Sequence, residues 1–187
     1  MNLPYKIAAL CYLFDERGRV LLLHRVKPPN QDLYSPIGGK LEQALGESPT
    51  ACAKREIKEE AGLDIPLADL HLTGIVSETA YLGQTHWLMF LYEVTRPVEI
   101  AKEAMQFDEG RLEWHEPERI HELPIPLTDR GVIWPMFWKH RGSFFAAHID
   151  CSTMPMRWRL EQPGSDDWQP LAPGSIAAPS PKTPTTR

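Results

Sequence analysis

The chain has few cysteines, no long apolar run and no excess of positive charge, and each shortage excludes a class of protein. Its three cysteines, Cys11, Cys52 and Cys151, are scattered and form no C-x-x-C pair. A disulfide framework or a structural zinc site is therefore not indicated, and a reducing cytoplasm is the expected location. The net charge of -5 argues against binding to duplex nucleic acid or to an anionic membrane, because both require a basic surface.

The N-terminal apolar run IAALCYLF is too short to span a bilayer. It ends directly at Asp15 and Glu16 without a small-residue cleavage site, so we interpret it as a buried strand and not as a signal peptide. A small anionic ligand would then need local cations or a metal ion.

The order of predicted elements indicates an α+β fold in one domain, residues 1–160. Strands are predicted at residues 5–14, 20–26, 72–82, 85–94 and 142–150. The first two strands are expected to pair around the turn DERGR, and the next two around a Gly-Gln turn. A helix perturbed by Pro135 is expected before the last strand.

The C-terminal residues 161–187 differ in composition from the rest of the chain. Six of the 18 prolines lie in these final 27 residues, among Ser, Thr, Gly and Ala. This composition is typical of segments that bury too little apolar surface to fold, so a disordered tail is predicted.

A helix predicted from about residue 49 to 61 carries an unusual acidic stripe. Ser48 followed by Pro49 is a good helix start and Gly62 a good stop. Glu56, Glu59 and Glu60 are spaced i, i+3 and i+4 and therefore share one face, where they repel one another.

The ordinary interpretation of such a stripe is a solvated acidic face. Lys54 and Lys58 lie on other faces, however, and do not alternate with the glutamates. The glycine pair Gly38 and Gly39 also precedes the helix and leaves backbone groups accessible. Clustered carboxylates beside a backbone carbonyl are the ligands that Mg²⁺ prefers, so a metal site is the favoured hypothesis.

The whole segment resembles the signature of the Nudix hydrolases, which is G, five residues, E, seven residues, R-E-apolar-x-E-E-x-G-apolar. Glu47 and the run 55–63, REIKEEAGL, match every fixed position of the second part. Seven residues instead of five separate Gly39 from Glu47, which predicts an enlarged loop around Gln43 to Leu45.

The resemblance implies an α/β/α sandwich with a mixed β-sheet between helices. It also implies an enzyme that uses Mg²⁺, with Mn²⁺ as a substitute, to hydrolyse a phosphoanhydride in a nucleoside diphosphate-linked substrate. The implied metal ligands are Gly39, Glu56, Glu59 and Glu60. Glu47 and Arg55 would form an ion pair that holds the loop on the helix, and Arg55, Glu56 and Glu59 would be catalytic.

Three further side chains outside the signature are candidates for the same site. Glu109, followed by Gly110 and Trp114, resembles an E-G-x-x-x-W segment of nucleoside-triphosphate-cleaving members, and it is expected to be an additional catalytic carboxylate and metal ligand. The alternative is a solvated turn. Arg25 and Lys27 are predicted to contact phosphates, with an exposed strand end as the alternative.

The base of the nucleotide is expected to contact Ser35 and Asp129, whose positions resemble those of base-reading residues in members that clean the nucleotide pool. A helix cap or first-turn acid beside Thr128 is the alternative role of Asp129. An aromatic wall of the base pocket is expected from Trp87, Tyr34 or Trp134, and the sequence does not decide among these three.

These candidates favour a purine nucleoside triphosphate as the small-molecule partner, with 8-oxo-dGTP among the options. An ADP-ribose or dinucleoside polyphosphate pyrophosphatase and a non-catalytic nucleotide-sensing module stay open as alternatives.

Overall fold

The computed structural model describes residues 2–28, 30–101, 105–164 and 167–171. Its strands are β1 Tyr5–Tyr12, β2 Val20–Arg25, β3 Tyr34–Ser35, β4 Ile37–Lys40, β5 Leu70–Tyr81, β6 Thr85–Val94, β7 Gln106–Phe107, β8 Gly110–His115, β9 Phe145–Asp150, β10 Arg157–Gln162 and β11 Gln169–Pro170. The α-helices are α1 Pro49–Ala61 and α2 Trp134–Lys139, and a π-helix, η5 Asp129–Ile133, leads into α2. Short 3-10 helices are η1 Gln43–Leu45, η2 Leu67–Asp69 and η4 Pro117–Glu122.

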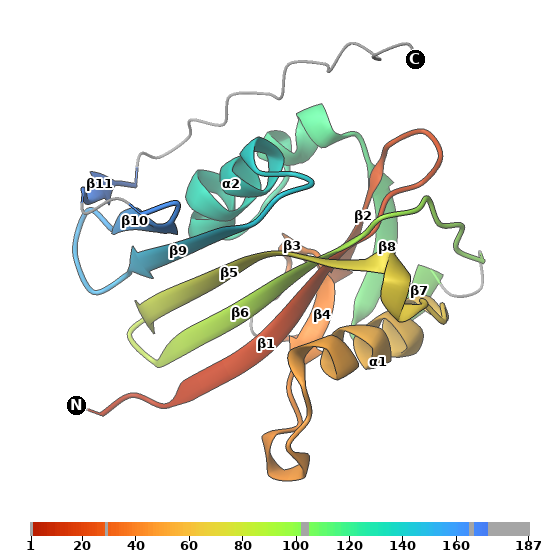
Figure 1. Cartoon of the computed structure of the whole chain (residues 1–187), viewed down its shortest axis with the longest axis horizontal. Helices are drawn as coiled ribbons and strands as arrows, with labels where there is room; N and C mark the ends of the chain where they lie inside the picture. Colours follow the sequence, from red (N-terminus) through yellow and green to blue (C-terminus); the bar gives the residue numbers. More distant parts are fainter. Residues whose placement is uncertain (1, 29, 102–104, 165–166, 172–187) are drawn as a thin grey trace.

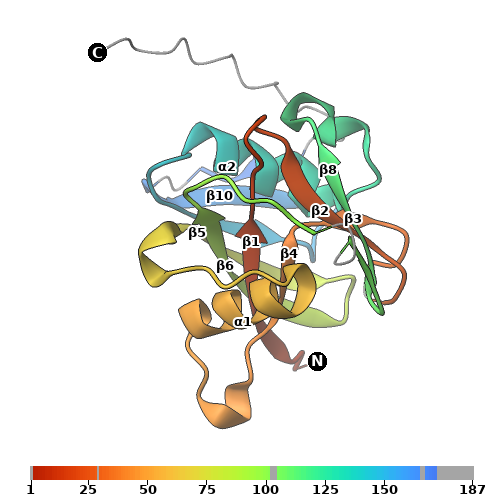
Figure 2. The ribbon, with the colours of Figure 1, turned by 90° about the vertical axis from the view of Figure 1, so that its right-hand side faces the viewer.

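The strands form two sheets. The larger is mixed and has seven strands in the order β11-β10-β9-β5-β6-β1-β4, with the β1–β6 and β5–β9 pairs parallel and the other pairs antiparallel. The smaller is antiparallel, in the order β3-β2-β8-β7, and lies beside the main sheet in Figure 2. The β5–β6 hairpin was predicted from the sequence and is confirmed.

Helices cover both faces of the main sheet, with α1 below it and η5 and α2 above it in Figures 1 and 2. The alternation of side chains along β1 explains this layering. Ala9 and Cys11 pack on the α1 side, and Ala8 and Tyr12 pack on the α2 side. The expected α+β sandwich with a mixed sheet between helices is therefore confirmed.

The predicted pairing of the first two strands is confirmed only beside the turn, where Phe14 and Val20 form an antiparallel bridge and the Leu21 N–H donates to the Leu13 carbonyl at 3.0 Å. Away from the turn the strands separate, because β1 lies in the main sheet and β2 in the smaller one. The reason is the double burial of β1, because a strand with two apolar faces is stabilised at the centre of a covered sheet. Its two edges are occupied by β4 and β6, so no edge is left for β2.

The boundary predicted at residue 160 also needs correction. Strand β10 continues to Gln162, and β11 pairs with it through Arg157 and Trp158. Leu171 is buried against the core, and a Cβ atom on Gly131 would lie only 2.9 Å from its Cδ1 atom. The packed domain therefore extends at least to Leu171, and the remainder of the predicted tail, 172–187, lies outside the described residues.

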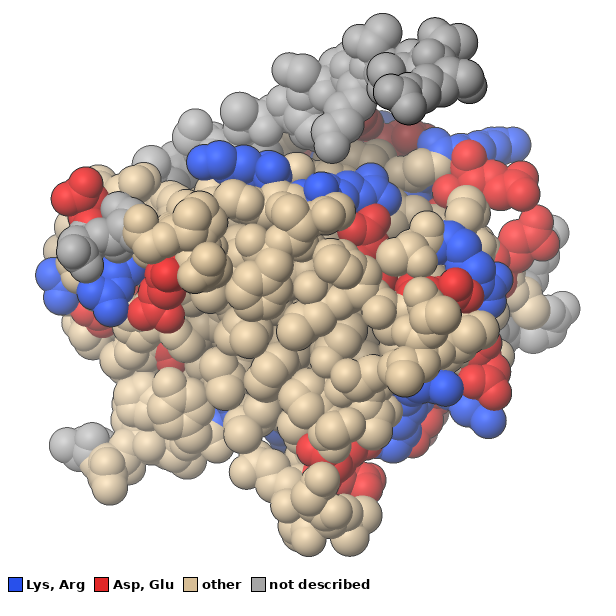
Figure 3. Space-filling view, in the orientation of Figure 1, with Lys and Arg blue, Asp and Glu red and all other residues tan. Residues whose placement is uncertain are grey.

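Charged side chains of both signs lie near one another along the rim of the face shown in Figure 3, and the centre of this face is largely uncharged. Among the described residues, no helix has the length and apolar character needed to cross a membrane.

Candidate active site

Helix α1 begins and ends where its sequence predicts. The Ser48 hydroxyl accepts a hydrogen bond from the Ala51 N–H at 3.2 Å, and Gly62 ends the helix in the left-handed conformation. Ala53, Ile57 and Ala61 are buried against the sheet. The acidic stripe consequently lies at the margin of the buried face, next to β4.

Arg55 connects the start of this segment to its glutamates. Its Nε and Nη2 atoms donate to the two carboxylate oxygens of Glu47 at 2.8 and 3.0 Å, a bidentate arrangement. Its Nη1 atom donates to Glu56 at 2.7 Å and to Glu59 at 3.0 Å. These hydrogen bonds hold the pKa of Glu47 below its ordinary value and tie the loop to the helix.

The enlarged loop predicted before the helix forms a 3-10 turn at Gln43–Leu45 that projects from the domain, and Figure 1 shows it below α1. Leu45 at its tip is 78% exposed. The Glu42 N–H donates to Glu47 at 2.8 Å across the base of the loop. The two extra residues are therefore accommodated outside the site, and the register of α1 is unchanged.

The two glycines at the start of the signature allow backbone and carboxylates to approach closely. Gly38 has φ of +146°, and a Cβ atom there would lie 2.1 Å from the Ala9 carbonyl oxygen. A Cβ atom on Gly39 would lie 2.2 Å from a carboxylate oxygen of Glu56. The Gly38 N–H donates to Glu60 at 3.0 Å, and the Gly39 carbonyl accepts from the Cys52 thiol at 3.6 Å.

Four carboxylates share this region. Burial raises the pKa of Glu56, and the charges of Glu59 and Glu109 raise it further, against the hydrogen bond from Arg55. Burial, followed by repulsion from Glu56 and Glu109, raises the pKa of Glu60 to about 8. Glu109 lies in the β7–β8 turn, so the turn adds its charge to the stripe on α1.

Oxygen donors of this kind have the chemistry of a magnesium site, because mutual repulsion of the carboxylates is relieved by a divalent cation. In the described part of the chain, however, no three His, Cys, Asp or Glu side chains are gathered tightly enough to hold a metal ion. Glu56 and Glu59 accept instead from Arg55, and Glu60 from the backbone. The types of donor atom therefore suit Mg²⁺, but in this structure the carboxylates accept hydrogen bonds from protein groups.

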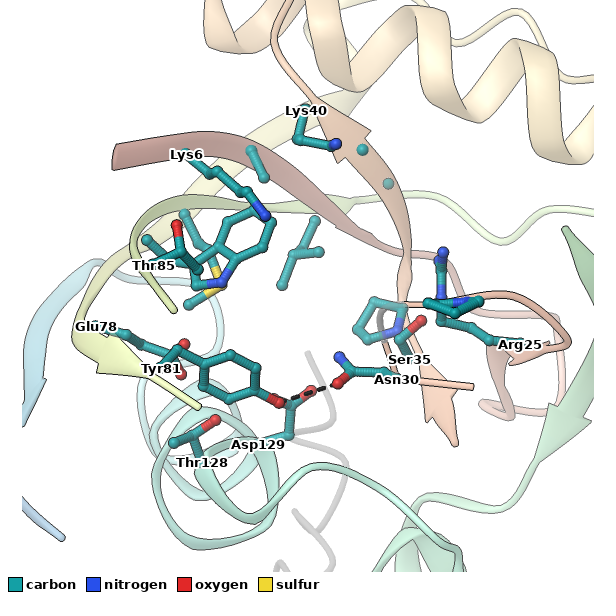
Figure 4. Close-up of a pocket in the computed structure, with 18 of the residues that line it drawn as sticks. Lys6, Arg25, Asn30, Ser35, Lys40, Glu78, Tyr81, Thr85, Thr128 and Asp129 are labelled. Carbon is teal, nitrogen blue, oxygen red and sulfur yellow. Dashed lines mark hydrogen bonds between the residues drawn. The ribbon is translucent and has the colours of Figure 1, made fainter. Parts of the chain in front are cut away.

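A cavity of about 480 Å³ lies beside the stripe (Figure 4). It brings together seven of the residues predicted from the sequence: Arg25, Lys27, Ser35, Gly39, Glu56, Glu109 and Asp129. Arg25 lies 3.4 Å from Glu109, which joins the cationic and acidic parts of the wall. The other four predicted residues do not line the cavity: Glu47, Arg55, Glu59 and Glu60. Arg55 and Glu60 contact it indirectly, through hydrogen bonds with the lining residues Glu56 and Gly38.

The inner end of the cavity is more polar than expected. Asp129 is 9% exposed and begins the π-helix, an element that often occurs at functional sites. The alternative role of Asp129, as a cap or first-turn acid beside Thr128, agrees with its position in the first turn of the π-helix, while the Thr128 side chain at the N-cap makes no capping hydrogen bond. Tyr81 reaches the same region and donates to Asn30 at 3.0 Å.

The aromatic wall differs in part from the prediction. Trp87 lines the cavity, and the amine of Lys6 lies 5.3 Å from the centre of its ring. Trp134 is buried in the core against Tyr12, and Tyr34 stacks on His24, so neither of these lines the cavity.

Lys6, Lys40 and Glu78 also line the cavity but were not among the site residues predicted from the sequence. Glu78 could have been found, because it follows Gly74 and Val76 at alternate positions of β5 and so belongs to the buried face of that strand. A charged residue at such a position is a signal for function. The two lysines carry no comparable signal in the sequence.

The NUDIX domain profile matches residues 4–133. The chain belongs to the Nudix family. An uncharacterised Nudix hydrolase, YvcI of Bacillus subtilis, is 29% identical over 126 residues, which are 66% of this chain and 74% of YvcI. A protein of Mycobacterium tuberculosis named putative 8-oxo-dGTP diphosphatase 2 is 30% identical over 133 residues, 71% of this chain and 89% of that protein.

Solved structures agree with this assignment. The crystal structure of a mutator MutT protein from Bacillus halodurans is 25% identical in sequence and superposes with a TM-score of 0.65. The match covers 84% of this chain and 98% of that protein. The Nudix signature seen in the sequence therefore lies in a Nudix fold, and the chain is a Nudix hydrolase.

Proposed function

We propose that this Nudix hydrolase cleaves a phosphoanhydride bond in a purine nucleoside triphosphate and depends on a divalent metal ion. One observation carries the proposal: a single cavity joins Glu56 of α1 and the basic residues Arg25 and Lys27 to a polar inner end at Asp129. Its volume of about 480 Å³ falls within the usual range for sites of small-molecule ligands.

The two ends of the cavity suit the two ends of a nucleotide. Arg25 and Lys27 provide positive charge for phosphate oxygens at the end where Glu56 and Glu109 lie. Ser35 and Asp129 provide hydrogen-bonding groups for a base, with Trp87 on the same wall. A ligand in this orientation keeps its phosphates away from the buried carboxyl of Asp129.

Mg²⁺ or Mn²⁺ would be held by Glu56, Glu59, Glu60, Glu109 and the Gly39 carbonyl. Such an ion polarises phosphate oxygens and favours a hydroxide-like nucleophile. Both effects suit the cleavage of an anhydride between phosphates, whose leaving group is an anion.

The protein groups would divide the reaction between positioning and proton transfer. Arg55 and Glu47 hold the α1 carboxylates at the cavity. A water molecule forms a bond to phosphorus while the anhydride P–O bond breaks, and a carboxylate accepts the proton of the water. Glu56 is the acceptor we favour, because it lines the cavity. Arg25 and Lys27 offset the negative charge that gathers on the phosphates.

The name of the M. tuberculosis relative makes 8-oxo-dGTP a suitable first substrate. ADP-ribose and dinucleoside polyphosphates are the competing substrates, because the signature does not determine the group attached to the diphosphate. A sensing module without catalysis is the competing class, and the complete R-E-I-K-E-E run argues against it.

The test is a substrate panel of 8-oxo-dGTP, dGTP, dCTP, ADP-ribose and a dinucleoside tetraphosphate, with products identified by chromatography. We expect metal-dependent release of a nucleoside monophosphate and pyrophosphate, fastest with a purine triphosphate. Glu59→Gln and Glu60→Gln should each lower kcat by at least 100-fold, about 2.7 kcal/mol of barrier. Glu42→Gln is the matched control on the exposed loop.

Equal rates in excess chelator would contradict the metal dependence. A clear preference for ADP-ribose over every triphosphate would replace the proposed substrate, and the absence of turnover on the whole panel would favour the sensing module.

A further inference from the structure

Two carboxyl groups line the inner end of the cavity, and neither is paired with a cation in the described part of the chain. Glu78 comes from β5 and Asp129 from the π-helix, and both line the cavity (Figure 4). They are 3% and 9% exposed. Within the described ranges neither forms an ion pair, and Oε1 of Glu78 is buried without a hydrogen-bond partner.

A buried carboxylate without a counter-ion is costly, and a second one nearby adds repulsion. Burial raises the pKa of Glu78 to about 7. Burial, followed by the charge of Glu78, raises the pKa of Asp129 to about 8, while the Thr128 hydroxyl opposes both shifts. The pair therefore retains a proton near neutral pH.

The titratable groups that face the pair do not supply positive charge. They are Tyr12 on β1, Tyr81 on β5 and Cys151 after β9. Burial raises the pKa of each, so all three are uncharged near neutral pH. The amine of Lys6 lies elsewhere on the wall, at the ring of Trp87. The pair therefore lies on the cavity wall without a neutralising charge, and among the described residues Oε1 of Glu78 has no hydrogen-bond partner.

We propose that Glu78 and Asp129 act as one recognition pair that binds the edge of a neutral heterocycle on which an N–H donor adjoins a carbonyl or ring-nitrogen acceptor. Glu78 is thereby a specificity-determining residue in addition to Asp129. This inference rests on the proposed function, because it assigns the base end of the same cavity.

The proton that the pair retains near neutral pH explains the choice of ligand. The ionised carboxyl accepts from the N–H of the heterocycle, and the protonated carboxyl donates to the neighbouring acceptor. A phosphate group lacks this N–H donor and is repelled by the carboxylate. An occupant with the wrong edge leaves a buried carboxyl unpaired, which gives strong discrimination.

The test measures binding and needs no turnover. The affinities of dGMP and of 2-deoxyribose 5-phosphate, which lacks the base, are determined by calorimetry in the presence of a chelator. The ratio of the two affinities isolates the contribution of the base. We expect Glu78→Gln to lower this ratio at least tenfold at pH 7.5 and Asp129→Asn to do the same.

Glu93→Gln is the matched control, because Glu93 is also a buried glutamate but pairs with Arg141 outside the cavity. It should leave the ratio unchanged even where it lowers stability. In the wild type the ratio should pass through a maximum between pH 7 and 8 and fall on both sides, since only the singly protonated pair offers a donor and an acceptor. This maximum should disappear in Glu78→Gln.

An unchanged ratio in Glu78→Gln, or a ratio independent of pH in the wild type, would overturn the inference and leave Glu78 a structural residue. Failure of the proposed function is a separate outcome. A chain that binds dGMP in a Glu78-dependent way without hydrolysing any nucleotide supports the inference alone, whereas hydrolysis without base-dependent affinity supports the function alone.

Discussion

Replacing Asp129 with Asn should change the pH dependence of stability in a defined direction. The side chain is buried, and its pKa rises from 3.8 to about 8, mainly because of burial. The folded state therefore holds a proton that the unfolded state releases above about pH 4. Stability is greatest below that pH and falls as the pH rises toward 8, which is the direction for an acid with a raised pKa in the folded state.

The magnitude follows from the size of the shift. Each pKa unit corresponds to about 1.36 kcal/mol, so Asp129 should lower the free energy of unfolding by about 4 kcal/mol between pH 5 and pH 8. Asparagine is uncharged at both pH values and lacks this loss, although its buried amide carries a desolvation cost of its own. We expect Asp129→Asn to be more stable than the wild type at pH 8 by about 1 to 4 kcal/mol.

Urea denaturation at pH 5 and pH 8 measures the effect. Other groups titrate in this range, including Glu60, so the relevant quantity is the difference between variant and wild type at each pH. We expect this difference to grow with pH. A constant difference would show that Asp129 is not a buried, uncompensated acid and would refute the electrostatic reasoning behind the recognition pair. A stabilised variant with weaker base binding would be typical of a site whose function opposes stability.

Two further predictions concern the metal end and the C-terminal strands. Glu109→Gln should lower kcat at least tenfold, about 1.4 kcal/mol, in a steady-state assay, while Asp108→Asn on the same exposed turn stays close to wild type; the reverse result would move the role to Asp108. Truncation after Leu160 should lower the melting temperature by several degrees, because it removes part of β10, all of β11 and the buried Leu171, whose side chain alone is worth about 1.5–3 kcal/mol. Truncation after Leu171 should have little effect, and equal melting temperatures for the two truncations would show that the C-terminal strands do not stabilise the domain.

Those parts of the fold and site that depend on residues close together along the chain could be predicted from the sequence. Helix α1 was predicted because Ser48, Pro49 and Gly62 mark its ends locally, and the β5–β6 hairpin because its turn joins adjacent strands. The partners of β1 could not be predicted, since its pairing with β6 joins residues about 80 positions apart. Local patterns indicate that a strand exists, but they carry no information about which distant edge it meets.

The C-terminal strands were missed for a different physical reason. Composition averages over a segment, and the many prolines after residue 160 outweigh a few apolar side chains. Leu171 nevertheless packs against the π-helix, because Gly131 has no side chain to occupy that space. A single complementary contact of this kind is invisible to composition.

The cavity itself shows why a signature reveals one half of a site better than the other. The acidic end, where we propose the metal ion, depends on α1 and the loop before it, where fixed spacing along the chain also fixes the arrangement in space. The inner end is assembled from β5 and the π-helix, about 50 residues apart, so Glu78 and Asp129 meet only through the tertiary fold. Repulsion between carboxylates is present at both ends, but it has different solutions. Under the proposed function a divalent cation would neutralise several charges at the α1 end, whereas at the inner end a retained proton and a neutral base would suffice. The electrostatics of the cavity would thereby orient a nucleotide before any specific contact is made.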